Sequence, residues 1–300
     1  MKKDLIIIWS LVKRGIKVFL KDKASVFFSL LAPLIVFFLY VAFLGDLQVQ
    51  SLEQALVGVP VSKDVMHAFV DGWMIAGVMG VACITVSFSA NNIMVQDKAR
   101  GVLSDAYSAP VKRGVLRASY FAYNFLVSAV ICLVVLVVCF VYLAISGWYL
   151  ALADVFAIVG HTLLSVLSAS LISVFLTGFL KSEPALGAIV GIMSAAIGFL
   201  CGAYFPLSML PKFVQYVVLF IPGTYSAGVF RNLFMGGAYA EIAAVNGQAA
   251  AEAGQAFSMN LDFFGSPMSK GGMLVVLLSV TALCIVVNVV YALVVSRKKF

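Results

Sequence analysis

Long uncharged apolar stretches alternate with short polar segments along most of the chain. Each stretch holds about 20 residues or more, the length that an α-helix needs to cross the hydrocarbon core of a bilayer. The stretches are typical of helices and not of barrel strands. Six of them are bounded by charged residues or by Gly and Pro, and we expect them to be membrane spans: 26–45, 72–95, 119–146, 155–180, 185–205 and 272–295.

The composition agrees with this pattern. Hydrophobic residues make up 63% of the 300 residues and charged residues only 11%, and the mean hydropathy is +1.09. A soluble domain, a disordered chain, a secreted disulfide scaffold and a free-standing nucleic-acid binder are excluded, despite the net charge of +7. We therefore predict an all-α integral membrane protein in which residues 1–300 form a single transmembrane domain.

The positive charges are distributed unevenly among the connecting segments. With the basic N-terminus placed in the cytoplasm, sixteen of the 20 Lys and Arg residues fall on the cytoplasmic side. The exceptions are Lys63, Lys212, Arg231 and Lys270. This distribution obeys the positive-inside rule. It predicts a multi-pass protein of the cell membrane, such as a bacterial plasma membrane, with both termini cytoplasmic.

The first segment, residues 1–24, has the pattern of an amphipathic helix. Arg14, Lys17 and Lys21 lie opposite a mainly apolar face. Such a helix lies in the headgroup region, where Trp9 would anchor it and the lysines would meet anionic phosphates. The alternative is a cytosolic helix packed against the bundle. The apolar face comprises Leu5, Ile8, Trp9, Val12, Ile16, Phe19 and Leu20.

The predicted spans contain no Asp, Glu, Lys or Arg, and His161 is the only histidine in them. Proton-driven transport needs titratable groups at depth, so this absence argues against it. We interpret His161 as an interface residue bonded to a neighbour or a headgroup. The five cysteines have no metal-ligand spacing, and no phosphate-binding loop ending in Gly-Lys-Ser or Gly-Lys-Thr occurs. We predict neither a catalytic site nor a metal site, and the energy for any work must come from a partner.

The one substantial cytoplasmic connection, residues 96–118, mixes charges with a short apolar stripe. Val102, Leu103, Ala106 and Tyr107 would share one face of a two-turn helix that Pro110 ends. Such a face suits a groove on another protein. The alternative is a basic loop that serves only topology.

A second unusual segment, residues 206–236, follows the fifth predicted span. Its apolar part, 213–221, is too short to cross the bilayer and is bracketed by Pro211 and Pro222. It predicts a re-entrant hairpin that dips in from outside, which is tolerated where backbone is buried in protein. The alternative is a flat helix on the outer leaflet. For residues 237–271 we considered a substrate lid, a partner site and a mobile loop, and we favour the loop.

Small residues share one face of the fifth predicted span. Their spacing permits close helix approach, either within the subunit or between two copies. These residues are Gly187, Gly191, Gly198 and Gly202.

The connection at 96–118 resembles the coupling segment of ABC transporter permeases of the type 2 exporter class. Arg100-Gly101, Leu103, Pro110-Val111 and Arg113 match the family pattern in order, whereas Val102 and Lys112 replace its usual Thr and Ser. In that family the segment docks on the ATP-hydrolysing subunit. The resemblance assigns partner coupling to Asp97, Arg100, Gly101, Val102, Leu103, Tyr107, Pro110 and Arg113.

The second segment also resembles these permeases, which place two short re-entrant helices there. The matching pattern is a Phe-Pro pair, a Leu-Pro pair four residues later, another Pro and then a Tyr. The corresponding hairpin residues are Phe205, Pro206, Pro211, Pro222, Tyr225 and Arg231.

The resemblance implies a permease subunit without an ATP site of its own. It would pair with a second copy, around a pathway that spans two and five line, and with ATP-hydrolysing subunits that bind ATP and Mg²⁺. It would export a hydrophobic or amphipathic compound such as a drug, an antibiotic peptide or a lipid. Alternatives are export of a lipid-linked polysaccharide, an ATP-independent channel or carrier, and a membrane-embedded enzyme.

Overall fold

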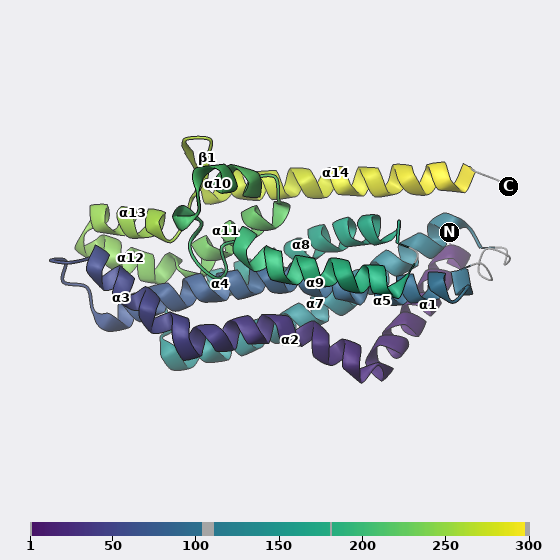
Figure 1. The fold of residues 1–300 in the computed structure, drawn as a ribbon, viewed down its shortest axis with the longest axis horizontal. Helices are drawn as coiled ribbons and strands as arrows, with labels where there is room; N and C mark the ends of the chain where they lie inside the picture. Colours follow the sequence, from purple (N-terminus) through teal and green to yellow (C-terminus); the bar gives the residue numbers. More distant parts are fainter. Residues whose placement is uncertain (1, 104–110, 181, 298–300) are drawn as a thin grey trace.

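The computed structural model of the chain describes residues 2–103, 111–180 and 182–297. Long helices lie side by side along its longest axis (Figure 1). Six helical segments are long and apolar enough to cross a membrane, which confirms the prediction of an all-α membrane protein with six spans. They are Pro33–Ala55, Lys63–Ala99, Arg113–Ser146, Leu152–Thr177, Glu183–Leu200 and Lys270–Ala292.

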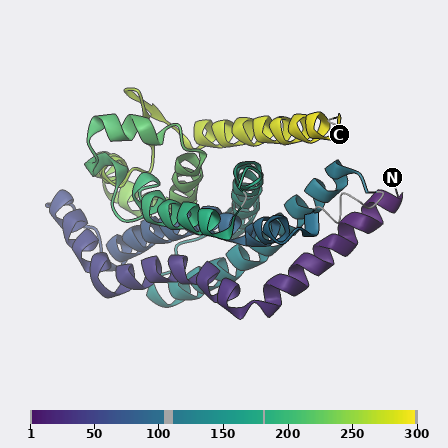
Figure 2. The same ribbon diagram turned by 45° about the vertical axis from the view of Figure 1, so that its right-hand side comes forward.

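The helices of the bundle run between two distinct ends. The beginning of α1 and the end of α14 lie at one end together with α5, in both views of the molecule (Figures 1 and 2). We call this the basic end, and the opposite end, where α3, α12 and α13 lie, the cap end. The bundle helices are α1 (Lys2–Lys21), α2 (Lys23–Leu39), α4 (Lys63–Ala90), α5 (Asn92–Ala99), α7 (Arg113–Ser146), α8 (Leu152–Thr177), α9 (Glu183–Leu200) and α14 (Lys270–Arg297).

Two spans are longer than predicted because they continue into the cap end. The first passes from α2 through a π-helical turn, η1 (Tyr40–Leu44), into α3 (Gly45–Ala55). The second begins at Lys63, nine residues before its predicted start. Asp71, which directly precedes the predicted span 72–95, therefore lies within α4, where it is buried and accepts a hydrogen bond of 3.1 Å from the Tyr142 hydroxyl.

Helix α4 is the centre of the bundle and is buried almost all round. Two glycines allow other backbone to approach it closely. A Cβ on Gly72 would lie 2.8 Å from the carbonyl oxygen of Phe234, and one on Gly77 would lie 2.7 Å from the Cα of Ala203. Even an alanine at either position would require the backbone to shift. The two glycines therefore determine how closely α4 packs against the hairpin.

The chain turns sharply after the fifth span. Helix α9 ends at Leu200, earlier than the predicted 205, and Gly202 follows with a φ of +68°, a conformation that favours glycine. A 3₁₀ turn, η2 (Leu207–Met209), then leads into α10 (Lys212–Val218) and α11 (Pro222–Phe234). The two helices are bent by 96°. A bent hairpin is thus confirmed between spans five and six, and its longer arm is α11, whereas the predicted arm 213–221 covers most of α10 and the bend.

The segment that we interpreted as a mobile loop is folded. It comprises α12 (Gly236–Val245), α13 (Gly247–Ala256) and a two-stranded hairpin, β1 (Leu261–Phe263) and β2 (Ser266–Met268). The ring of Phe257, which follows α13, packs edge-on against Phe69 and Trp73 of α4 at centroid distances of 5.4 and 5.7 Å. The interpretation as a loop is therefore wrong, because small apolar side chains and this aromatic contact bury the segment against α4.

Candidate functional site

The basic end is organised around the carboxylate of Asp97, which is 5% exposed. Arg14 of α1 forms two hydrogen bonds with it, Nη1 to Oδ2 at 2.6 Å and Nη2 to Oδ1 at 2.7 Å. The Tyr120 hydroxyl of α7 donates to Oδ2 at 2.7 Å. Such a two-pronged charge-assisted contact is among the strongest polar contacts in proteins. Asp97 therefore joins α1, α5 and α7 into one unit.

This contact changes the role that the sequence assigned to Asp97. Its carboxylate is buried and accepts three hydrogen bonds from within the subunit, so it is not exposed for contact with another chain. Arg14, which we expected on a solvated polar face, is its ion partner. The hydrogen bonds with Asp97 raise the pKa of Arg14 above its ordinary value, so the guanidinium keeps its charge at all physiological pH values.

Helix α1 combines the two interpretations that its sequence left open. Val12 and Phe19 are buried in the core, and Gly15 lies directly against the ring of Tyr123 of α7, so one face is packed on the bundle. Leu5 and Trp9 stay more than half exposed. That second apolar face is free to enter a bilayer surface.

The segment that resembles a coupling helix begins where the Asp97 cluster ends. Arg100 is exposed and lies 3.5 Å from Glu183 of α9, and Gly101 turns the chain with a φ of +79°. Val102 and Leu103 are half-buried. Tyr107 and Pro110 lie outside the described residues.

Leu103 and Arg113 line a cavity of about 200 Å³ at the basic end. Lys98, Arg117 and Tyr291 also line it, and the Arg117 guanidinium lies over the Tyr291 ring at 4.0 Å from the ring centroid. Lys98 Nζ donates to the carbonyl oxygen of Gly178, at the end of α8, at 2.8 Å. Through Lys98 and Arg117, the connection between the second and third spans thus contacts the end of α8 and α14.

At the other end of the bundle, Arg231 of α11 holds the re-entrant hairpin together. Its side chain is completely buried, and it donates hydrogen bonds to the carbonyl oxygens of Cys201, Gly202 and Ser258. The first two carbonyls belong to the turn after α9, where a helix leaves acceptors without partners. A cation there also complements the negative end of the α9 dipole. We had counted Arg231 as an external charge, and its position in the core replaces that interpretation.

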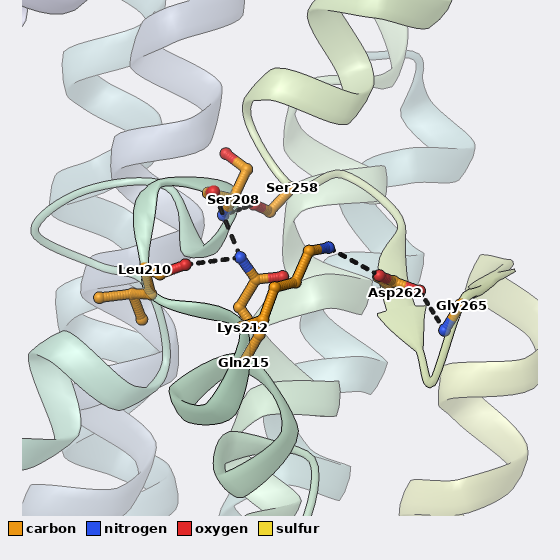
Figure 3. Close-up of polar contacts among 7 residues, drawn as sticks. All are labelled: Ser208, Leu210, Lys212, Gln215, Ser258, Asp262 and Gly265. Carbon is orange, nitrogen blue, oxygen red and sulfur yellow. Dashed lines mark hydrogen bonds and ion pairs between the residues drawn. The ribbon is translucent and has the colours of Figure 1, made fainter.

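A polar cluster joins the hairpin to the cap, as Figure 3 shows. The backbone N–H of Ser208 donates to Ser258 Oγ at 3.0 Å, and Gln215 Nε2 donates to the Leu210 carbonyl oxygen at 2.7 Å. Lys212 Nζ lies 3.2 Å from Asp262, whose other oxygen accepts from the N–H of Gly265. Arg231 and this cluster share Ser258, so the hairpin and the cap are held as one body.

The remaining predicted hairpin residues shape its turns. Tyr225 is buried and its hydroxyl donates to the Leu219 carbonyl oxygen at 2.7 Å, across the bend between α10 and α11. Pro211 precedes the first residue of α10, and Pro222 is the first residue of α11, where its missing N–H costs nothing. The ring of Phe205 packs edge-on against the ring of Phe199, with 5.5 Å between the ring centroids, and Pro206 is buried.

The small-residue face of the fifth span divides into two halves. Among the described residues, none has an atom within 4 Å of a Cβ added at Gly187 or Gly191, so these two glycines face open space there. Gly198 lies against the Tyr204 ring, and Gly202 lies against Arg231 and Leu207. The second pair therefore serves packing inside the subunit, and only the first pair is available for another chain.

His161 is a core residue and not an interface residue. It is buried, and its Nε2 lies 3.0 Å from the Ser226 carbonyl oxygen of α11, while its ring stands edge-on to Phe230 at 4.4 Å. Arg14, Tyr120 and Ser258 are further members of these clusters that the sequence does not predict. Nothing in the local pattern marked them, because their partners are distant in the chain.

Replacing Arg231 with Leu should destabilise the hairpin, because three buried carbonyl groups would lose a charged donor worth about 1.5–3 kcal/mol per hydrogen bond. We expect a clear fall in the unfolding temperature of the purified protein. Lys212→Leu removes the exposed ion pair with Asp262 from the same hairpin and serves as control, with a change of at most about 1 kcal/mol. Equal stability of the two variants would contradict the anchoring role.

Comparison with known proteins identifies the family of the chain. The sequence model of the family described as "ABC-2 type transporter" matches residues 7–235, more than half of the chain. The match stops where α12 begins, so it leaves out the folded cap segment and α14. No curated protein and no solved structure matches the chain. The chain belongs to the ABC-2 type transporter family and is a multi-pass membrane subunit of an ABC transporter.

Proposed function

We propose that this permease exports a hydrophobic or amphipathic compound and is driven by a separate ATP-hydrolysing subunit that docks at its basic end. The observation that carries the proposal is the position of the Arg100–Leu103 segment. It emerges directly after the buried Asp97 and exposes the side chain of Arg100, 65% of which is accessible. A partner that pushes on this segment acts on helices that Asp97 has already joined.

The geometry supports a lever-like coupling mechanism. Helix α5 continues α4 after a break at Asn91, and Asp97 fixes α5 to α7 through Tyr120 and to α1 through Arg14. Closure of the ATP-hydrolysing subunits would move α5 and the start of α7 together. Because α4 packs on α11, this movement reaches the hairpin at the cap end.

The orientation and the second copy follow from the same features. Lys and Arg gather at the basic end, so we assign this end to the cytoplasm and the cap to the outside. Only 17% of the residues of α9 are buried within the subunit, and Gly187 and Gly191 lie on the open surface of this helix. We assign this surface to a second permease copy, and the space between the two copies to the pathway.

Docking at the basic end can be tested with two variants. Arg100→Glu and Leu103→Asp should reduce the amount of ATP-hydrolysing subunit that co-purifies by about tenfold or more, the effect of losing about 1.4 kcal/mol at an interface. Lys270→Glu makes the same charge reversal at the cap end and should have no effect. Unchanged co-purification of both variants, or uphill accumulation of a lipophilic dye in liposomes that hold the permease alone, would contradict the proposal.

Asp97→Asn should separate docking from coupling. The buried position of Asp97 means that co-purification should persist, while dye efflux per ATP hydrolysed should fall. The loss of the ion pair should cost about 1–2 kcal/mol of stability, less than for a fully buried pair because the Arg14 side chain is 41% exposed. Combining Asp97→Asn with Arg14→Gln should cost less than the sum of the two single changes. Additive effects would show that the contact does not position α5.

The dimer surface can be tested with a bulky side chain. Gly191→Trp should reduce the fraction of cross-linked permease dimer without lowering the unfolding temperature, since an added Cβ there meets nothing within 4 Å. Gly160→Trp on α8 is the matched control, because Gly160 is equally open but lies on another face. If the two variants dimerise equally well, α9 does not form the contact.

A further inference from the structure

A small cavity lies inside the subunit, among α4, α8, α9 and the beginning of α11. Its volume is about 100 Å³. The hydroxyl-bearing residues Ser165, Ser168 and Ser226 line one part, and apolar side chains such as Ile84, Phe88 and Ile197 line most of the rest. Among the described residues that line it there is no Asp, Glu, Lys or Arg.

Ser168 is exceptional among the hydroxyl groups of α8. Thr162 and Thr177 donate to carbonyl oxygens four residues earlier on their own helix, at 2.8 and 2.6 Å, as hydroxyls in apolar surroundings usually do. Ser168 is 2% exposed, and its Oγ has no hydrogen-bond partner among the described residues. A buried hydroxyl without a partner costs about 1–3 kcal/mol. An alanine would avoid this cost, so the hydroxyl needs another explanation.

The cavity also receives the N-terminus of α11. Ile221, Pro222 and Gly223 line it, and α11 continues for 13 residues from Pro222. The N–H groups of Ile221 and Thr224 already donate to the carbonyl oxygens of Val218 and Ile221, and Pro222 has none, so the N–H of Gly223 and the helix dipole give this N-terminus its partial positive charge, which is strong where water is excluded. Beside it, the Oγ atoms of Ser165 and Ser226 lie 2.6 Å apart. These two hydroxyls are partners of each other, so the hydroxyl of Ser168, the N–H of Gly223 and the dipole of α11 are what point to a ligand that accepts hydrogen bonds.

We propose that this cavity binds the carboxylate of an amphipathic compound. Its volume corresponds to about three water molecules, which suits a carboxylate and excludes a whole drug or lipid. The apolar part of the compound passes Met193, which also lines the cavity, and continues along the open surface of α9. The binding site does not depend on the proposed function, but the conclusion that the bound compound is cargo rests on it.

The experiment uses the full chain in phosphatidylcholine nanodiscs and two light-activated probes of equal length, a diazirine-bearing hexadecanoic acid and the corresponding amine. The acid should label the wild-type cavity, and the amine, which has only donors, should not. Ser168→Ala should weaken labelling by the acid about tenfold, the effect of one hydrogen bond to a charged group. Its unfolding temperature should not fall, because the change removes only a hydroxyl without a partner.

Ser128→Ala is the matched control. Ser128 of α7 is fully buried, its Oγ also has no partner among the described residues, and it does not line the cavity. This variant should label like the wild type. Equal labelling by acid and amine, or equal effects of Ser168→Ala and Ser128→Ala, would overturn the proposal. No ATP-hydrolysing subunit is present in this assay, so failure of docking at Arg100 and failure of this site are separate outcomes.

Discussion

In hydrocarbon, every backbone polar group must find a partner inside the protein, and the broken helix after the fifth span meets this constraint through Arg231. Helix α9 stops inside the bundle, and the chain reverses twice before α11 leads to the cap. Each reversal exposes carbonyl groups that water cannot reach. Arg231 donates to two carbonyls of the first turn and to Ser258 of the cap. This one side chain thus links the end of α9, the hairpin and the cap.

The basic end obeys the same constraint with the opposite charge. Asp97 is a buried anion, and the hydrogen bonds from Arg14 and Tyr120 offset the free energy lost when its carboxylate leaves water. The two buried ionic groups therefore divide the work between the ends. Asp97 joins α1, α5 and α7 at the basic end, and Arg231 joins the end of α9, the hairpin and the cap at the other.

The length of the apolar stretches and the residues that bound them predicted a span well where the helix stops at the end of its apolar stretch. The third span ends at Ser146, as predicted, because Gly147 follows with a φ outside the helical range. Prediction failed where helices leave the bilayer but stay in protein. The second span was predicted to begin after Asp71, because a charged residue normally lies outside a span. Contacts with the cap instead allow α4 to begin at Lys63. The Ala-rich segment 237–271 looked unstructured because its buried face consists of small side chains such as Ala250 and Ala253.

The site residues divide in the same way. Arg100 and Gly101 could be found from a local motif, whereas the contact between Arg14 and Asp97 spans 83 positions and the bonds of Arg231 to Ser258 span 27. A single sequence carries no signal for such pairs.

Helix α4 connects the two ends of the bundle. With 28 residues it forms a rod of about 42 Å with few places to bend, so the two faces of the membrane share one mechanical element. Under the proposed function, an antibody that binds the cap from outside would restrain α4 and so slow ATP hydrolysis by the partner subunit at the opposite end.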